Sequence, residues 1–381
     1  MHFFKWLFLS LFEKLFIMRV SDILSYLESK FPISSQASFD NCGLLVGDNQ
    51  AIAKGVLICL DCTEEVIEEA ISLGCNLIIA HHPLIFKGIK KLTGSNYVER
   101  TILKAIRSDI SIYAMHTNLD HAINGVNAEI AYRLNLVNCR VLDPQPNVLV
   151  KLSVFVPVTH SEIVRETVFK TGGGQIGNYD SCSFTSKGEG TFRPLENSNP
   201  YTGKHAEFSQ VEEKKMEFLV SIHKLQSVIK QMLKVHPYEE VAYDVVSLQN
   251  VNTFEGSGMI GELPKSVNSL EFLSRVKEIF HCGTIRHTKL LSKEIKTVAF
   301  CGGSGSFLLS KAIRQKADIF ITGDFKYHEF FDADKQIVIA DIGHYESEQF
   351  TSELIYRILT EKFVKFAFNV TKVNTNPINY F

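Results

Sequence analysis

The segment CNLIIAHHPLIFKG spans residues 75–88 and places two adjacent histidines, His81 and His82, directly after an apolar run. A short, continuous apolar run predicts a strand that is buried in a largely parallel sheet. Adjacent strand residues point to opposite faces, but Pro83 turns the chain here, so the two imidazoles can diverge towards neighbouring positions. Ligands bind at the carboxyl edge of open α/β sheets. Taken alone, the pair fits such a site and fits capping or surface histidines equally well.

Short apolar runs alternate with helical patterns on both sides of this segment. The clearest examples are GVLICLD (55–61), TEEVIEEAISLG (63–74), ISIYAMHTNLD (110–120), IKTVAFCGG (295–303) and DIFITGD (318–324). Strands that alternate with helices predict an α/β fold with largely parallel sheets. We therefore expect two related three-layer α/β lobes, residues 18–147 and residues 251–381.

The middle of the chain has a different pattern. Residues 148–250 contain a strand, a helix and a glycine-rich turn, then a polar stretch, then a strand, a helix, a His-Pro break and a further strand. Two successive strand–helix–strand patterns are typical of the ferredoxin-like α+β arrangement. We predict that residues 148–250 form such a domain, inserted between the two lobes.

The composition is that of a soluble globular protein and excludes some partners. Apolar residues make up 45% and charged residues 22% of the 381 residues, and the formal net charge is −2. No basic surface for nucleic acid and no electrostatic attraction to a membrane is expected from this balance. Eight cysteines are present, and the one C-x-x-C, Cys59 and Cys62, has no second ligand pair at matching spacing. Buried, reduced thiols and a cytoplasmic location are therefore expected.

The first 17 residues, MHFFKWLFLSLFEKLFI, are strongly apolar. Charges at Lys5, Glu13 and Lys14 leave no uncharged run long enough to span a bilayer, and no small-residue cleavage site follows. We interpret residues 1–17 as an extension outside the fold, with Met18 as the natural start. The alternative is an interfacial membrane helix.

Two further strand ends carry the same residue types as the first. ISIYAMHTNLD ends with His116 and Asp120, and KQIVIADIGHYESE (335–348) ends with His344 and, four residues later, Glu348. On a helix that begins near His344, this spacing puts both side chains on one face. Three strand ends therefore bring imidazoles and carboxylates to the same edge of the fold.

This set of residues is what two divalent transition metal ions roughly 3.5–4 Å apart need, with carboxylates that bridge and imidazoles that bind one ion each. Such a pair activates water for hydrolysis. The two lobes are thus expected to form one metal-binding unit. The nitrogen and oxygen ligands suit zinc, iron, manganese or nickel alike.

From residue 18 to residue 381 the sequence resembles the Nif3-like family, whose members are also named GTP cyclohydrolase 1 type 2 homologues. The resemblance is carried by FDNCGLLVGD (39–48), AHHPLIF (80–86), HTNLD (116–120), GSGMIGELP (256–264), CGGSGS (301–306), TGDFKYHE (322–329), GHYESE (343–348) and TNPINYF (375–381). It implies a dinuclear metal centre with the ligands His81, His82, Asp120, His344 and Glu348. It also implies a toroidal homohexamer. Long members of the family carry a PII-like or CutA-like insert, and VHPYEEVAYDVV (235–246) resembles the signature of that insert.

Two functions follow as expectations. The first is a metal-dependent hydrolase, similar to GTP cyclohydrolase, that acts on a nucleotide-like or phosphorylated small molecule, with Glu348 or His116 transferring protons. The second is a metal-binding regulatory or interaction protein whose insert senses a small ligand. Whether the protein is an enzyme stays open at this stage.

Weaker candidates lie near the same strand ends. His116 fits a cavity-lining role or simple packing, and His328 and Asp324 have the same two interpretations. Asp40 and Asn41 fit an Asx turn as well as a site. The glycine-rich FCGGSGS (300–306) fits a phosphate-binding loop or only a tight strand-to-helix turn.

Overall fold

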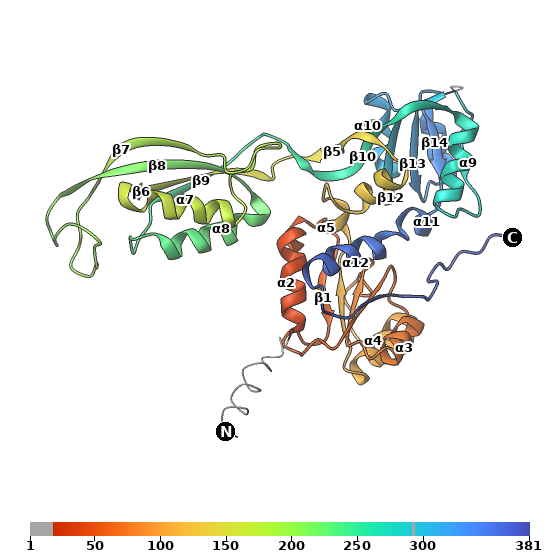
Figure 1. Ribbon diagram of the computed structural model, residues 1–381, viewed down its shortest axis with the longest axis horizontal. Coiled ribbons are helices and arrows are strands. Elements are labelled where there is room, and N and C mark those ends of the chain that lie inside the picture. The colour runs from red at the N-terminus through yellow and green to blue at the C-terminus, as the bar shows by residue number, and fades with distance from the viewer. Residues whose placement is uncertain (1–17, 292–293) are drawn as a thin grey trace, which may run out of the picture. The chain divides into compact units, whose positions relative to one another are not determined.

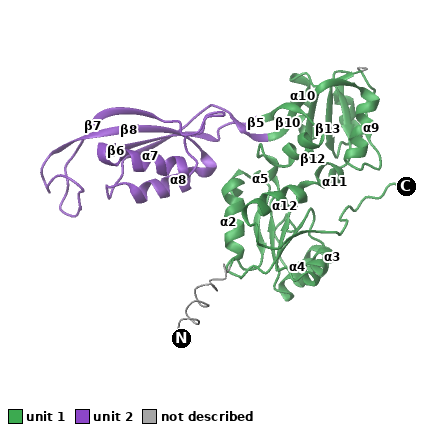
Figure 2. Ribbon diagram, in the orientation of Figure 1, with its two compact units in different colours: residues 1–143, 257–381 green, residues 144–256 purple. Residues whose placement is uncertain are grey.

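The computed structural model describes residues 18–291 and 294–381. The prediction for residues 1–17 lies outside the described residues. The described chain divides into two compact units, of which residues 144–256 form the second and the remaining residues the first (Figure 2). Within the described ranges, no helix is long and apolar enough to cross a membrane.

The first unit contains a five-stranded sheet in the order β1-β4-β3-β2-β15. Its strands are β1 (Gly43–Val46), β2 (Val56–Cys59), β3 (Leu77–Ala80), β4 (Ser111–Ala114) and β15 (Phe368–Val370). The pairs β15–β2, β2–β3 and β3–β4 are parallel, and β1 pairs with β4 antiparallel. The last strand of the chain therefore lies in the same sheet as the strand that precedes His81.

Helices cover both faces of this sheet (Figure 1). On one face, α3 (Glu64–Ser72) and α4 (Tyr97–Arg107) pack on a core that includes Leu57 and Ile78. On the other face, α2 (Val20–Lys30), α6 (Val126–Arg133) and α12 (Thr351–Lys362) enclose a core that includes Ile58 and Ile79. Every residue of β2, β3 and β4 is buried, which explains why these strands read as continuous apolar runs.

A six-stranded sheet, in the order β11-β14-β13-β12-β10-β5, completes the first unit. Its strands are β5 (Val137–Gln145), β10 (Asn252–Asn268), β11 (Arg286–His287), β12 (Glu294–Ser304), β13 (Ile319–Gly323) and β14 (Val338–Asp341). The pairs β12–β13 and β13–β14 are parallel. Helices α9 (Ser269–Ile279) and α10 (Leu309–Arg314) pack on opposite faces of this sheet. Short helices α5 (Thr117–Asp120) and α11 (His344–Glu348) follow β4 and β14.

The second unit is a four-stranded antiparallel sheet with two helices. Its elements are β6 (Leu149–Pro157), α7 (Ser161–Lys170), β7 (Phe184–Phe192), β8 (Ser209–Ser221), α8 (Ile222–Val235) and β9 (Tyr243–Ser247). The strand order is β7-β8-β6-β9. Residues of β6 and β8 that alternate along the strands, such as Val154 and Met216, form the core beneath α7 and α8, and the opposite face of the sheet carries polar and aromatic residues.

Short 3-10 helices join several of these elements, namely η1 (Ile33–Ser35), η2 (Val158–His160), η3 (Ser306–Leu308) and η4 (Tyr327–Ala333). The three sheets with their covering helices confirm the mixed α/β class. The grouping into two related lobes, the ferredoxin-like assignment and the domain boundaries expected from the sequence stay predictions.

Candidate metal centre

His81 and His82 follow β3 and remain attached to the sheet through their backbone. The His81 N–H donates to the Cys59 carbonyl at 3.1 Å, and the His82 N–H donates to the Leu60 carbonyl at 2.9 Å. The chain therefore keeps its strand path for two residues past β3, and the side chains leave from the carboxyl edge. His81 is fully buried and His82 is partly exposed.

At the other two strand ends, the candidate ligands lie on short helices that follow the strands. After β4 the chain passes His116 and forms α5, which ends at Asp120. After β14 the chain turns at Gly343, whose φ is +98°, and α11 begins at His344. His344 and Glu348 lie one turn apart on this helix, as the spacing predicts.

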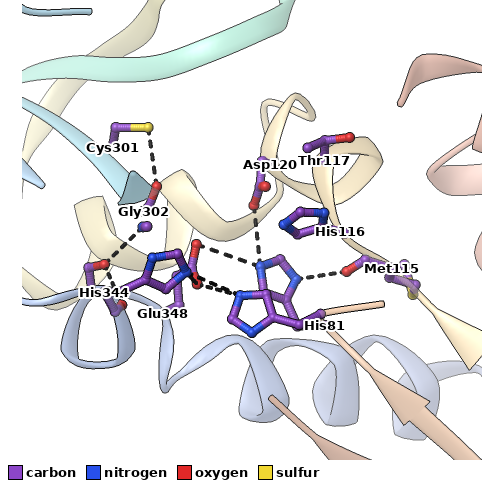
Figure 3. A network of polar contacts seen from close by, with 12 residues as sticks. His81, Met115, His116, Thr117, Asp120, Cys301, Gly302, His344 and Glu348 are labelled. Carbon is purple, nitrogen blue, oxygen red and sulfur yellow. Dashed lines mark hydrogen bonds and ion pairs between the residues drawn. The ribbon is translucent and has the colours of Figure 1, made fainter. Parts of the chain in front are cut away.

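Three of the predicted residues, His81, Asp120 and Glu348, surround one point (Figure 3). The His81 Nε2 atom lies 3.6 Å from Asp120 Oδ1 and 3.7 Å from Glu348 Oε1. His81 Nδ1 lies 2.7 Å from the Met115 carbonyl and donates to it, which leaves the lone pair on Nε2. His81 Nε2 and Asp120 Oδ1 are buried and have no hydrogen-bond partner. Buried polar atoms without partners are costly, and a bound cation would satisfy both of these.

A second group of ligand atoms shares Glu348 with the first. Glu348 Oε2 lies 2.9 Å from His82 Nε2 and 3.1 Å from His344 Nε2, and these two nitrogens are 3.3 Å apart. The other oxygen of Glu348 faces His81, so the carboxylate connects the two groups. The imidazole and carboxylate donors of both groups fit divalent transition metals.

Two carboxylates contact the Nδ1 atoms of the second group's imidazoles and orient the rings. His82 Nδ1 donates to Asp61 Oδ1 at 2.8 Å, and His344 Nδ1 donates to Asp324 Oδ2 at 2.7 Å. Such partners fix the tautomer and the ring orientation of metal-binding histidines. Asp61 is in turn held by the Thr375 hydroxyl at 2.8 Å, so a residue near the end of the chain supports the site.

The cluster carries a strong negative field. Burial lowers the pKa of His82, but hydrogen bonds to Asp61 and Glu348 outweigh it and raise the pKa to about 10. In the same way Asp324 and Glu348 raise the pKa of His344 to about 11 against the effect of burial. Burial and the adjacent Glu348 carboxylate raise the pKa of Asp120 to about 7. Excess negative charge of this kind attracts cations.

The glycine-rich end of β12 packs against Glu348. Gly303 has a φ of +61°, and a Cβ atom there would lie 2.4 Å from Glu348 Oε1. The Gly303 N–H donates to the Ser347 hydroxyl and the Gly302 N–H donates to Asn127 Oδ1. These two N–H groups are therefore used within the fold, which favours the tight-turn interpretation of the loop over a phosphate-binding one.

We expect Gly303→Ala to disrupt the metal centre, because its methyl group would displace the Glu348 carboxylate. The left-handed backbone conformation adds a strain of about 1–2 kcal/mol. Gly74→Ala is the matched control, since Gly74 has a φ of +68° but no atom within 4 Å of the added methyl group. Bound metal per chain, measured after dialysis, should fall in Gly303→Ala and stay at the wild-type level in Gly74→Ala. Equal metal content in both variants would show that the glycine does not shape the site.

His116 lies beside the cluster in a third carboxylate–imidazole pair. Its Nδ1 donates to Asp40 Oδ1 at 2.8 Å, and its ring centroid lies 5.4 Å from that of His81 and 5.5 Å from that of His82. Asp40 also accepts hydrogen bonds from the backbone and hydroxyl of Thr117. Although burial opposes it, these contacts hold the pKa of Asp40 well below its usual range, so the carboxylate stays ionised.

The sequence analysis missed Asp61 altogether and undervalued Asp40. Asp61 is the second residue after β2, in the same position at its strand end as His82 has after β3. The strand-end rule applied to every strand would have found it. Of the weaker candidates, Asp324 contacts His344, whereas His328 packs on Phe331 with ring centroids 6.4 Å apart.

Comparison with known proteins identifies the family. The family model described as Duf34/NIF3 (NGG1p interacting factor 3) matches residues 18–377. The chain belongs to the Duf34/NIF3 family. The membership predicted from the motifs is confirmed, and the PII-like or CutA-like nature of the insert stays a prediction.

Full-length relatives of this Duf34/NIF3 protein have a common name. A protein of Halalkalibacterium halodurans named GTP cyclohydrolase 1 type 2 homolog is 40% identical over 363 residues, which cover 94% of this chain and 98% of the relative. A Staphylococcus epidermidis protein of the same name is 34% identical over 367 residues, with coverages of 95% and 100%.

Solved structures of similar proteins have the same fold. A Bacillus cereus protein related to NIF3 superposes with a TM-score of 0.83 at 37% identity, over 96% of this chain and all of that one. A Staphylococcus aureus protein, SA1388, superposes with a TM-score of 0.73 at 30% identity, over 96% and 99% of the two chains. The Duf34/NIF3 fold described above is therefore shared over nearly the whole length.

Proposed function

We propose that this protein is a dinuclear-metal hydrolase that acts on a nucleotide-like or phosphorylated small molecule. One ion would be held by His81, Asp120 and Glu348, and the other by His82, His344 and Glu348. The observation that carries the proposal is the position of Glu348, whose two oxygens face two separate sets of ligand atoms. The unpaired, buried atoms His81 Nε2 and Asp120 Oδ1 support it further.

When bound, two such ions supply Lewis-acid activation of a water molecule near neutral pH. The chain's own residues then move the proton. His116 is suited to this role because Asp40 holds its Nδ1–H and leaves Nε2 able to accept a proton beside the cluster. The imidazoles of His344, His81 and His82 outweigh burial and hold the pKa of Glu348 far below its usual range, so Glu348 suits a ligand better than a proton carrier.

The loop that follows His82 supports an anionic substrate. Residues 83–91 and 96–99 line a cavity of about 600 Å³, and Lys87, Lys90 and Lys91 are among them. Three lysines in the loop that follows His82 favour phosphate-bearing substrates. The name shared by the relatives points to GTP, which we propose as the first compound to test.

The decisive experiment is turnover. Full-length protein is stripped of metal by chelation and reloaded separately with zinc, iron, manganese or nickel, then supplied with GTP and with a panel of phosphorylated metabolites. Metal-dependent release of formate or phosphate that disappears in His82→Ala supports the proposal. Absence of turnover with every metal, in protein that holds two ions per chain, refutes the hydrolase and leaves a metal-binding regulatory protein.

We expect Asp40→Asn to lower kcat roughly tenfold or more without loss of metal, because the amide cannot stabilise the protonated His116 ring. His116→Gln should have an effect of similar size. The double variant should be no worse than the worse single variant, because the two residues act as one unit. Additive losses, or loss of metal in Asp40→Asn, would show that Asp40 acts in another way.

We also propose two features that rest on the family resemblance and the topology. The order β6-α7-β7-β8-α8-β9 and the antiparallel sheet β7-β8-β6-β9 support a ferredoxin-like, PII-like or CutA-like domain in the second unit. The toroidal homohexamer is testable by light scattering on the purified protein, where a mass of one 43.0 kDa chain would contradict it.

A further inference from the structure

The His-Pro-Tyr-Glu-Glu segment, residues 236–240, builds part of a cavity in the second unit. His236 is buried, its Nε2 donates to the Phe155 carbonyl at 3.0 Å, and its Nδ1 accepts from the Tyr238 N–H at 3.1 Å. The imidazole is therefore neutral and fixes the backbone that carries Tyr238. Glu239 accepts from the Asn199 N–H at 2.7 Å and ties the segment to the loop between β7 and β8.

Aromatic rings form the walls of this cavity, whose volume is about 280 Å³. They belong to Phe155 on β6, Phe192 on β7, Tyr201 in the loop between β7 and β8, and Tyr238. The Tyr238 centroid lies 6.1 Å from that of Tyr201 and 6.4 Å from that of Phe192, and both pairs are tilted by about 50°. All four rings line this one cavity, and the face of an aromatic ring carries the negative part of its quadrupole.

A buried carboxylate, that of Glu213 on β8, lies in the same cavity. Glu213 is 9% exposed, and its Oε1 accepts from the Tyr238 hydroxyl at 2.8 Å. Among residues 18–291 and 294–381, no lysine or arginine forms an ion pair with it. A Cβ atom on Gly190 would lie 2.3 Å from Glu213 Oε2, so the glycine leaves room at this oxygen. A largely buried carboxylate without a cationic partner is costly and favours a cationic ligand.

The other charged residues that line the cavity are also acidic. Glu239 and Glu240 line it, and none of its lining residues is a lysine, arginine or histidine. Lys215 approaches the Phe155 ring at 6.0 Å from the centroid, but its ammonium group pairs with Glu217 at 3.1 Å. The cavity therefore repels phosphates and other anions.

We propose that this cavity binds a small organic cation of the ammonium class, with the charge against the aromatic faces and next to Glu213. Cations over aromatic rings are stabilised electrostatically, and methylated ammonium groups suit such walls best because they lose little hydration. The proposal goes beyond the hydrolase proposed above and does not depend on it, since every residue involved lies in the second unit.

Three matched compounds test the proposal by calorimetry on the full-length protein. Choline carries a trimethylated ammonium group, ethanolamine carries the same chain without the methyl groups, and 3,3-dimethylbutan-1-ol has the shape of choline without its charge. Choline should bind at millimolar or lower concentration, at least about tenfold more tightly than the neutral alcohol. Tighter binding of ethanolamine than of the alcohol would also support an ammonium site. Equal binding of choline and the alcohol, or no binding of either amine, would overturn the proposal.

Variants locate the binding site. Glu213→Gln keeps an acceptor for Tyr238 but removes the charge, and Tyr201→Ala removes one wall, so each should weaken choline binding about tenfold or more. Glu212→Gln is the control, because Glu212 precedes Glu213 on the same strand, is exposed and does not line this cavity. Unchanged choline binding in both Glu213→Gln and Tyr201→Ala would place the cation elsewhere and contradict the assignment.

Discussion

Glu348→Gln protein should lose both metal ions, with an affinity at least about 100-fold weaker at each position. Glu348 is the one residue that both groups of ligand atoms share, and it is 3% exposed, with its oxygens 2.9 Å from His82 Nε2 and 3.7 Å from His81 Nε2. Glutamine has the same shape, but its amide is neutral and offers one acceptor oxygen instead of two. It can neither bridge two ions nor balance their charge.

Glu346→Gln is a demanding control for this variant. Glu346 lies on the same helix, α11, and is 4% exposed, so its substitution disturbs the fold to a similar degree. Its carboxylate accepts a hydrogen bond from the Asn376 amide at 3.4 Å and takes no part in either group of ligands. Metal analysis of dialysed protein should find two ions per chain in Glu346→Gln and none in Glu348→Gln.

Asp120→Asn distinguishes two ions from one. Asp120 belongs to the group with His81 and lies outside the group of His82, His344 and Glu348. A dinuclear centre should therefore keep about one ion per chain in this variant. Retention of two ions in Asp120→Asn would contradict ligation by Asp120, and retention of any ion in folded Glu348→Gln protein would contradict the shared role of Glu348.

The strand ends were predictable from the sequence because their signals are local. The apolar run before His81 is fully buried as β3, and the spacing of His344 and Glu348 is realised on α11. The rule that ligands gather at the carboxyl edge of a parallel sheet then brings distant parts of the chain together. Those signals depend only on hydrophobic pattern and helical period.

Which acidic residue contacts which histidine was not predictable in the same way. Asp61 and Asp324 contact His82 and His344 through tertiary packing, and in the sequence each is one of many acidic residues after an apolar run. Strand β15 pairs with β2 across more than three hundred residues, which only non-local hydrogen bonding determines. The same holds for the cavity around Glu213, whose aromatic walls come from β6, β7, a loop and the segment before β9.

Metal loading should weaken steeply as the pH falls. In the metal-free protein, the pKa values of His82 and His344 are raised to about 10 and about 11 by their carboxylate partners, against the effect of burial, so both rings are protonated at neutral pH. A metal ion binds only the neutral imidazole, so loading must displace both protons. Each displaced proton weakens the apparent affinity tenfold per pH unit, which amounts to roughly 100-fold per unit for the ion that these two residues share.

The same raised pKa values also make the stability of the metal-free protein depend on pH, in the opposite direction to metal binding. A histidine whose pKa is raised in the folded state stabilises that state fully below its unfolded value of 6.5, and the stabilisation disappears as the pH rises through about 10 and 11. Metal-free protein is therefore stabilised in the acidic range, where the ions bind weakly. The loaded protein is stabilised at higher pH, where they bind tightly.

Calorimetric titration of metal into the stripped protein measures this coupling directly. Titrations at about pH 7.5 in buffers with different ionisation enthalpies should show about two protons released per chain from His82 and His344. Repetition at about pH 6.5 should show an affinity for that ion about 100-fold weaker. Because His121 contacts a backbone carbonyl at 3.0 Å and lies outside both ligand groups, His121→Gln should leave the proton count unchanged. An affinity that does not change with pH, or no proton release, would rule out imidazole ligation by His82 and His344.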